Sequence, residues 1–286
     1  MAQPNIQNCL IDTLNEITSL SKSLTKNQLS SPTNCPGWDV KDNISHIISI
    51  EAFLLGDKPT DHRATDLTHV KNDFGRFNEN EIDLRRSYET SKLVEELQDV
   101  VNRRIRYLKS LTKSDLMSKA WTPVGEKTLY DQCLIRLLDC FAHLQDIKTA
   151  LNFDFDTTSV SSAIILNYCI LTVPKTFAKT KGVAENNTLD LSINTQVDLN
   201  FTDIPLNHTE NMKNRCISFR LQKINGRGEF VDKPLGSPTC KISLNHQTFI
   251  ELCLGRINAE SVREFVEISG DTSLGVQILA NLNFMI

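Results

Sequence analysis

Apolar residues recur at helical spacing through roughly the first 180 positions of the chain. In the first segment they fall three or four apart, which is the period of one face of an α-helix, at Ile6, Leu10, Leu14, Ile17 and Leu20. The same period begins again after Trp38, near Leu93 and near Thr128. Four helices joined by loops predict an antiparallel four-helix bundle.

Polar residues mark where these helices begin and where the bundle is interrupted. Asp39 can cap the second helix, and Asp42 then lies in its first turn, near the positive end of the helix dipole. The stretch from Gly56 to Arg86 is too polar for a core element. We therefore expect a long loop over one mouth of the bundle.

Beyond about residue 185 the pattern changes to short runs of β-forming residues between turn signals. LDLSIN, CISFRLQKI, GRGEFV and CKISLN predict an antiparallel meander, and FIELCLGR and SLGVQILANL predict two helices. The expected fold class is α+β. The expected domains are a helical bundle over 1–155, a linking helix over 156–184 and a smaller α+β domain over 185–286.

Composition excludes several classes of function. Hydrophobic residues make up 40% of the chain and charged residues 23%, which are the proportions of a globular protein. The net charge is -4 and no dense Lys/Arg run occurs, so a nucleic-acid partner is not expected. The N-terminus lacks the pattern of a signal peptide, and we expect a cytoplasmic protein with no membrane segment. The eight cysteines form no C-x-x-C pair, so buried thiols are expected.

The predicted fourth helix carries one polar stripe on an otherwise apolar surface. Asp139 and His143 lie one turn apart on it, so a carboxylate oxygen and an imidazole nitrogen can reach one ion. His46 lies on the second helix, away from that helix's apolar face. These three side chains predict a metal site with an open fourth position, which is typical of catalytic zinc. The alternative is that the stripe is a solvated face.

The remaining histidines are expected at the surface. His62 and His69 lie in the polar stretch, and His208 and His246 lie near predicted turns. His69 is the one of these four that could border the site, because its loop could close over the bundle mouth. Trp38 and Trp121 are expected to pack at the ends of the bundle.

Two longer segments resemble one known family. CPGWDVKDNISHIISIEAFLLG is similar to the opening signature of the mycothiol-dependent maleylpyruvate isomerase family, and TPVGEKTLYDQCLIRLLDCFAHLQDIKTAL is similar to its second signature. FIELCLGR and VEISGDTSLGVQIL resemble its C-terminal part. The resemblance implies a DinB-like bundle, a sterol-carrier-protein-like C-terminal domain, and His46, Asp139 and His143 as metal ligands.

The resemblance also implies chemistry: a divalent metal, zinc first, that activates a low-molecular-weight thiol such as mycothiol. The thiol would serve isomerisation of, or S-transfer to, a small electrophilic substrate. Arg136 could bind a substrate carboxylate, hold Asp139 in place or form a purely structural ion pair. Two other functions stay open: a metal-stabilised protein that binds a lipid or small molecule without catalysis, and a purely structural metal.

Overall fold

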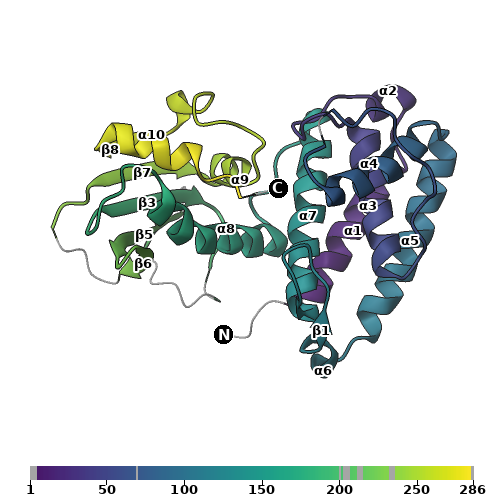
Figure 1. Cartoon of the computed structure of the whole chain (residues 1–286), viewed down its shortest axis with the longest axis horizontal. Coiled ribbons are helices and arrows are strands. Elements are labelled where there is room, and N and C mark those ends of the chain that lie inside the picture. The colour runs from purple at the N-terminus through teal and green to yellow at the C-terminus, as the bar shows by residue number, and fades with distance from the viewer. Residues whose placement is uncertain are drawn as a thin grey trace. The chain divides into compact units, whose positions relative to one another are not determined.

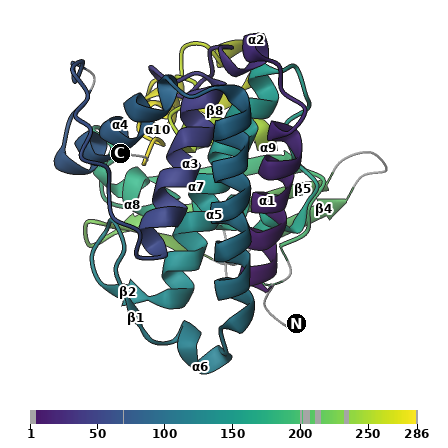
Figure 2. The same ribbon diagram turned by 90° about the vertical axis from the view of Figure 1, so that its right-hand side faces the viewer.

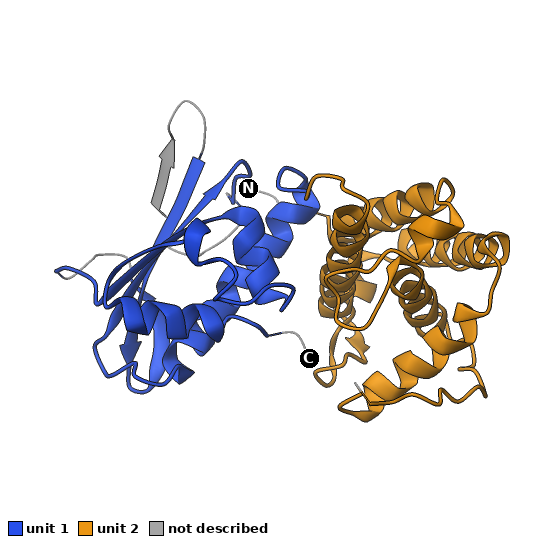
Figure 3. Ribbon diagram, turned by 90° about the horizontal axis from the view of Figure 1, so that it is seen from above, with its two compact units in different colours: residues 1–4, 156–286 blue, residues 5–155 orange. Residues whose placement is uncertain are grey.

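The computed structural model describes residues 5–68, 70–199, 201, 207–210, 215–231 and 236–284, and these form two compact units. The helical unit spans Asn5–Phe155 and the C-terminal unit spans Asp156–Ile286 (Figure 3). The mix of helices and strands is the α+β class expected from the sequence. The helix predicted over 156–184 falls inside the C-terminal unit as α8 (Val160–Lys179).

Four long helices build the helical unit (Figures 1 and 2). They are α1 (Ile6–Ser21), α3 (Val40–Leu54), α5 (Thr90–Ser110) and α7 (Leu129–Ala150). Helix α1 packs against α5 and α7, and α3 packs against the same two helices, so α1 and α3 occupy opposite corners. The four-helix bundle predicted from the apolar period is present.

Side-chain caps set the start of the two helices that carry the expected ligands. Asp39 accepts a hydrogen bond from the backbone N–H of Asp42 at the start of α3, as the sequence predicted. Thr128 and Asp131 form a reciprocal capping box at the start of α7. These caps satisfy backbone N–H donors and so fix the residue at which each helix begins.

The loop predicted from Gly56 to Arg86 is wrong in its second half, where α4 (Asp73–Arg86) forms and packs on α3. The high polarity of the segment hid the helix, because ion pairs accompany its few apolar contacts, such as those of the buried Ile82. Arg85 Nη1 lies 2.8 Å from Glu81 and its Nη2 lies 2.7 Å from Glu96. Arg86 lies within ion-pair distance of three carboxylates. Buried charges are tolerated when they are paired in this way.

Shorter elements complete the helical unit. They are the single-turn helices α2 (Lys26–Leu29) and α6 (Lys113–Leu116) and the small hairpin of β1 (Lys119–Ala120) and β2 (Lys127–Thr128). The hairpin directly precedes α7, and the backbone carbonyl of Trp121 accepts a 2.6 Å hydrogen bond from the Gln132 side chain on α7.

The C-terminal unit is a six-stranded mixed sheet with helices packed on it. The strands are β3 (Thr188–Thr195), β4 (Asn207–Glu210), β5 (Arg215–Ile224), β6 (Arg227–Val231), β7 (Cys240–Asn245) and β8 (Glu267–Gly270). Their order is β4-β5-β3-β7-β8, with β6 also paired to β5. Strands β3 and β7 are parallel, so the predicted antiparallel meander is wrong at this pair. Asn225 and Gly226 both have positive φ in the tight β5–β6 turn, as an Asn-Gly hairpin requires.

Three helices pack on this sheet: α8 on β5 and β6, α9 (His246–Cys253) on β3 and β7, and α10 (Thr272–Ala280) on β7 and β8. A 3-10 turn, η1 (Arg263–Phe265), precedes β8. Among the described residues, α8 is the one helix long and apolar enough to cross a membrane by length and composition, a test that buried core helices also pass. Nine of its residues are buried against the unit.

Candidate metal centre

The structure brings His46 on α3 together with Asp139 and His143 on α7. Nε2 of His46 lies 3.1 Å from Asp139 Oδ2, and Nε2 of His143 lies 3.7 Å from Asp139 Oδ1. The two imidazole centroids are 4.8 Å apart. Both histidines are buried, whereas the Asp139 side chain is 20% exposed. The polar stripe of α7 is therefore an interior surface and not a solvated face.

These three side chains form a group of donors that could hold a metal ion. Their donor atoms all lie within 4.8 Å of one another. Two ligands held about 2.0–2.1 Å from one tetrahedral ion lie about 3.3–3.4 Å apart, and the separations of 3.1 and 3.7 Å bracket that value. Two imidazole nitrogens and one carboxylate also form a donor set that zinc accepts, with a position left for a further ligand.

The electrostatics of the cluster follow from burial and from the charges around Asp139. Burial opposes ionisation of Asp139, but Arg136 and the two imidazoles hold the pKa of its carboxyl well below the usual range. Burial also opposes a charge on His143, yet the Asp139 carboxylate raises the pKa of that imidazole well above its usual value. Burial lowers the pKa of His46 to about 4 against the attraction of Asp139. His46 is therefore neutral at pH 7, as a metal ligand must be.

Arg136 lies beside the three predicted ligands and uses every nitrogen of its guanidinium. Nε lies 2.8 Å from Glu51 Oε1, Nη1 lies 2.6 Å from Asp139 Oδ2, and Nη2 lies 3.3 Å from the thiol of Cys140. The Arg136 side chain is 8% exposed. With Oδ2 of Asp139 held by Arg136, Oδ1 remains for an ion. This geometry favours the role of holding Asp139 over that of binding a substrate carboxylate.

Glu51 and Arg104 extend this network and were missed by sequence reasoning. Glu51 on α3 and Arg104 on α5 are both fully buried, and Oε2 of Glu51 lies 2.7 Å from Nε of Arg104. Burial disfavours the Glu51 carboxylate, but Arg136 and Arg104 hold its pKa below the usual value. The sequence signal was a lone acid at the end of the apolar run ISHIISIE.

A second group of donor atoms lies on the other edge of His143. Cys35, from the CPGW segment, and Asp146 have ligand atoms within 4.8 Å of each other and of a His143 ring nitrogen. Asp146 Oδ2 lies 3.4 Å from Nδ1 of His143. Asn43 Oδ1 lies closer to the same nitrogen, at 2.6 Å. Sequence reasoning placed neither Cys35 nor Asn43 at the site, because both come from the polar start of α3 and the loop before it.

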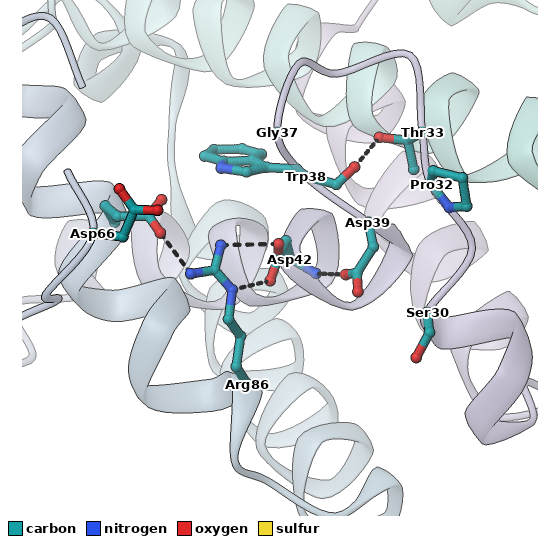
Figure 4. A pocket seen from close by; sticks show the side chains of 10 residues that line it. Ser30, Pro32, Thr33, Gly37, Trp38, Asp39, Asp42, Asp66 and Arg86 are labelled. Atoms are coloured by element: carbon teal, nitrogen blue, oxygen red, sulfur yellow. Dashed lines mark hydrogen bonds and ion pairs between the residues drawn. The ribbon is translucent and has the colours of Figure 1, made fainter. Parts of the chain in front are cut away.

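Trp38 separates the two histidines from an open pocket. Its ring centroid is 5.1 Å from that of His46 and 5.6 Å from that of His143. It also lines a pocket of about 560 Å³ together with Asp39, Asp42 and Arg86 (Figure 4). Arg86 donates to both oxygens of Asp42 in the pocket wall. Trp38 therefore borders the candidate site.

The other singled-out residues lie elsewhere. His62 is partly exposed and pairs with Asp83 at 2.6 Å, and Trp121 is 48% exposed. His246 was expected at the surface, and that prediction is wrong. It is 2% exposed, because the first turn of α9 packs onto β3 and β7. His69 and the His208 side chain lie outside the described residues.

The helical unit matches a known family model, and the overall fold matches a solved structure. Residues 12–148 match the family model described as the mycothiol maleylpyruvate isomerase N-terminal domain. No curated protein matches the chain. A crystal structure described as the mycothiol-dependent maleylpyruvate isomerase shares 12% identity, covers 92% of this chain and 91% of its own, and superposes with a TM-score of 0.52. A structure of a histidine-to-alanine mutant of that isomerase has the same identity and coverage and a TM-score of 0.49.

The fold thus defines a two-unit α+β protein with a four-helix N-terminal domain and a cluster of two histidines and an aspartate between α3 and α7. Residues 12–148 within that N-terminal domain belong to the domain family described as the mycothiol maleylpyruvate isomerase N-terminal domain. The family resemblance inferred from the two signatures is confirmed.

Proposed function

We propose that this chain is a zinc-dependent enzyme that activates a low-molecular-weight thiol, such as mycothiol, for isomerisation of or S-transfer to a small electrophile. The convergence of Nε2 of His46, the Asp139 carboxylate and Nε2 of His143 on one point carries the proposal. The mycothiol dependence of the isomerase with the same fold supports the choice of thiol.

His46 would hold the ion as a neutral donor, His143 would do so after releasing a proton, and Asp139 would be the anionic ligand. The protein ligands would then contribute a charge of about -1. When bound, a divalent ion with net positive charge lowers the pKa of a coordinated thiol and so favours the thiolate near neutral pH. A free thiol, with a pKa of about 8.5, is mostly protonated there. The thiolate is the form that adds to an electrophilic carbon.

The surrounding residues would serve this chemistry by position. Arg136 holds Oδ2 of Asp139, the oxygen that also lies beside His46, and leaves Oδ1 toward His143. Trp38 covers both imidazoles with an apolar ring and so limits the access of water from the pocket side. Exposure of one-fifth of the Asp139 side chain gives a thiol a route to the centre.

The test is a titration of mycothiol, bacillithiol and glutathione against metal-loaded and metal-free protein, with thiolate absorbance followed against pH. We expect the apparent pKa of the preferred thiol to fall in the metal-loaded protein. An unchanged thiol pKa would contradict thiol activation and favour a structural metal or a lipid-binding role. Bound lipid in a native mass spectrum separates those two outcomes.

A further inference from the structure

The edge of the His143 ring that faces away from Asp139 meets a buried amide. Nδ1 of His143 lies 2.6 Å from Oδ1 of Asn43, and the two side chains are almost fully buried. Asp146 Oδ2, at 3.4 Å, is a second acceptor near the same nitrogen. Nε2, on the opposite edge, faces Asp139.

The orientation of the Asn43 amide follows from its other partners. Its nitrogen Nδ2 donates to the backbone carbonyl of Asp39 at 2.7 Å and to Oγ1 of Thr33 at 3.1 Å. The Thr33 hydroxyl donates its single hydrogen to the backbone carbonyl of Trp38, at 2.7 Å. Oγ1 of Thr33 and the carbonyl of Asp39 therefore only accept from Asn43, and a flipped amide would place its oxygen against both.

An amide held in this orientation presents an acceptor to His143. Nδ1 of His143 must then carry a hydrogen, and the lone pair available to an ion is on Nε2. His46 differs, because its buried Nδ1 has no hydrogen-bond partner among the described residues. The fixed tautomer is thus a property of one of the two candidate histidine ligands.

We propose that Asn43 is a positioning residue for the metal centre, anchored by Thr33, that keeps the hydrogen on Nδ1 of His143 and makes Nε2 the ligating nitrogen. This inference rests on the proposed function, because it requires a metal ion at the site. It also decides between the two groups of donor atoms that share His143. The group with Cys35 and Asp146 needs the lone pair of Nδ1, and Asn43 removes that lone pair.

The experiment compares Asn43→Leu, which removes both the acceptor and the donor, with Asn43→Asp, which keeps an acceptor. Asn78→Leu is the matched control, because Asn78 is another buried asparagine of the helical unit, on α4. Zinc affinity is measured by competition with a chromophoric chelator. We expect Asn43→Leu to weaken zinc binding by about 10–100-fold, the usual effect of losing an outer-shell partner. Asn43→Asp and Asn78→Leu should stay within a few-fold of wild type.

Nitrogen-15 NMR of the zinc-loaded wild-type protein reads the tautomer directly and does not depend on a variant that folds. His143 should show a protonated Nδ1 and a ligated Nε2, and the cobalt-substituted protein should show no thiolate charge-transfer band. Ligation through Nδ1, a cobalt–thiolate band from Cys35, or unchanged zinc affinity in a folded Asn43→Leu variant would overturn the positioning role alone. A wild-type protein that takes up no metal would overturn the proposed function together with it.

Discussion

His143 in the helical unit and His246 in the C-terminal unit are both buried, but their pKa values are shifted in opposite directions. His143 in the helical unit lies beside the carboxylates of Asp139 and Asp146, and its pKa is raised well above the ordinary value despite burial. His246 in the C-terminal unit lies between the hydroxyls of Ser162 and Thr195, and burial lowers its pKa to about 4. Burial by itself favours the neutral imidazole, so the carboxylates beside His143 account for the difference between these two residues. At His46, burial outweighs the attraction of Asp139.

The contrast extends beyond these two residues. The interior of the helical unit contains a connected set of charges from α3, α5 and α7, in which Glu51 joins Arg104 and Arg136 and Arg136 reaches Asp139. In the C-terminal unit, the buried Arg220 on β5 forms an ion pair with Asp190 on the neighbouring strand β3. A buried network of charges is costly to desolvate, which is typical of a chemical site and not of a packing core.

The largest expected effect is the loss of zinc affinity when a proposed ligand in the helical unit is removed. His46→Ala and His143→Ala should each lose zinc by more than the roughly 10–100-fold that the loss of an outer-shell partner causes, because each removes a direct ligand. His62→Ala, a histidine on the same unit paired with Asp83, should bind zinc as wild type does. Metal analysis of the dialysed variants is the measurement. Full occupancy in both ligand variants would place the site elsewhere.

The next effect concerns the buried charges of the helical unit. Glu51→Gln leaves Arg104 and Arg136 without their shared carboxylate and should lower the free energy of unfolding by about 3–5 kcal/mol. Urea unfolding followed by tryptophan fluorescence reports on this unit, since Trp38 and Trp121 both belong to it. As a control, Glu96→Gln removes a partly exposed partner of Arg85 and should cost less than about 1 kcal/mol. Equal losses would remove the distinction between a fully buried acid, Glu51, and a partly exposed one, Glu96.

Acid should weaken the C-terminal unit through His246. Its pKa is near 6.5 when unfolded and about 4 when folded, so above pH 6.5 the group contributes nothing to pH dependence. As pH falls from 6.5 to 4, the unfolded state takes up the proton first, and stability drops by about 3 kcal/mol. Hydrogen exchange of β3 and β7 measures this. In His246→Gln that part of the acid loss should disappear; an identical acid profile in the variant would show that His246 is not its source.

The smallest effect is steric and belongs to the C-terminal sheet. A Cβ at Gly228 on β6 would lie 2.1 Å from the backbone oxygen of Pro174 on α8. Gly228→Ala should therefore push the helix from the strand and cost about 1–3 kcal/mol, while zinc binding stays unchanged. Arg227→Ala, at the exposed neighbouring position, should change stability by less than about 0.5 kcal/mol. Urea unfolding of the two variants gives the comparison, and equal stabilities would show that α8 and β6 are not in tight contact.

Sequence reasoning succeeded where one local pattern carries the information. The apolar period located α1, α3, α5 and α7, and it placed the start of α7 near Thr128. The predicted cap, Asp39, marked the start of α3. The Asn225–Gly226 turn located the β5–β6 hairpin. Each of these signals depends on residues only a few positions apart.

Sequence reasoning failed where a feature depends on residues that lie far apart in the chain. Helix α4 was missed because Arg85 and Arg86 are neutralised by residues on other elements, Glu96 and Asp42. The parallel pairing of β3 with β7 was missed because strand order depends on the path of the whole chain. His246 looked like a turn residue until α9 packed onto the sheet.

The sequence by itself determined the α+β class, the helix starts, the one-turn spacing of Asp139 and His143 and the family signatures that contain His46. Only the tertiary structure brought Asn43 to Nδ1 of His143, 100 positions away, and Glu51 to Arg136, 85 positions away. The physical reason is that apolar burial leaves a period in the local sequence, whereas a buried polar residue is stabilised by one specific partner that can lie anywhere in the chain.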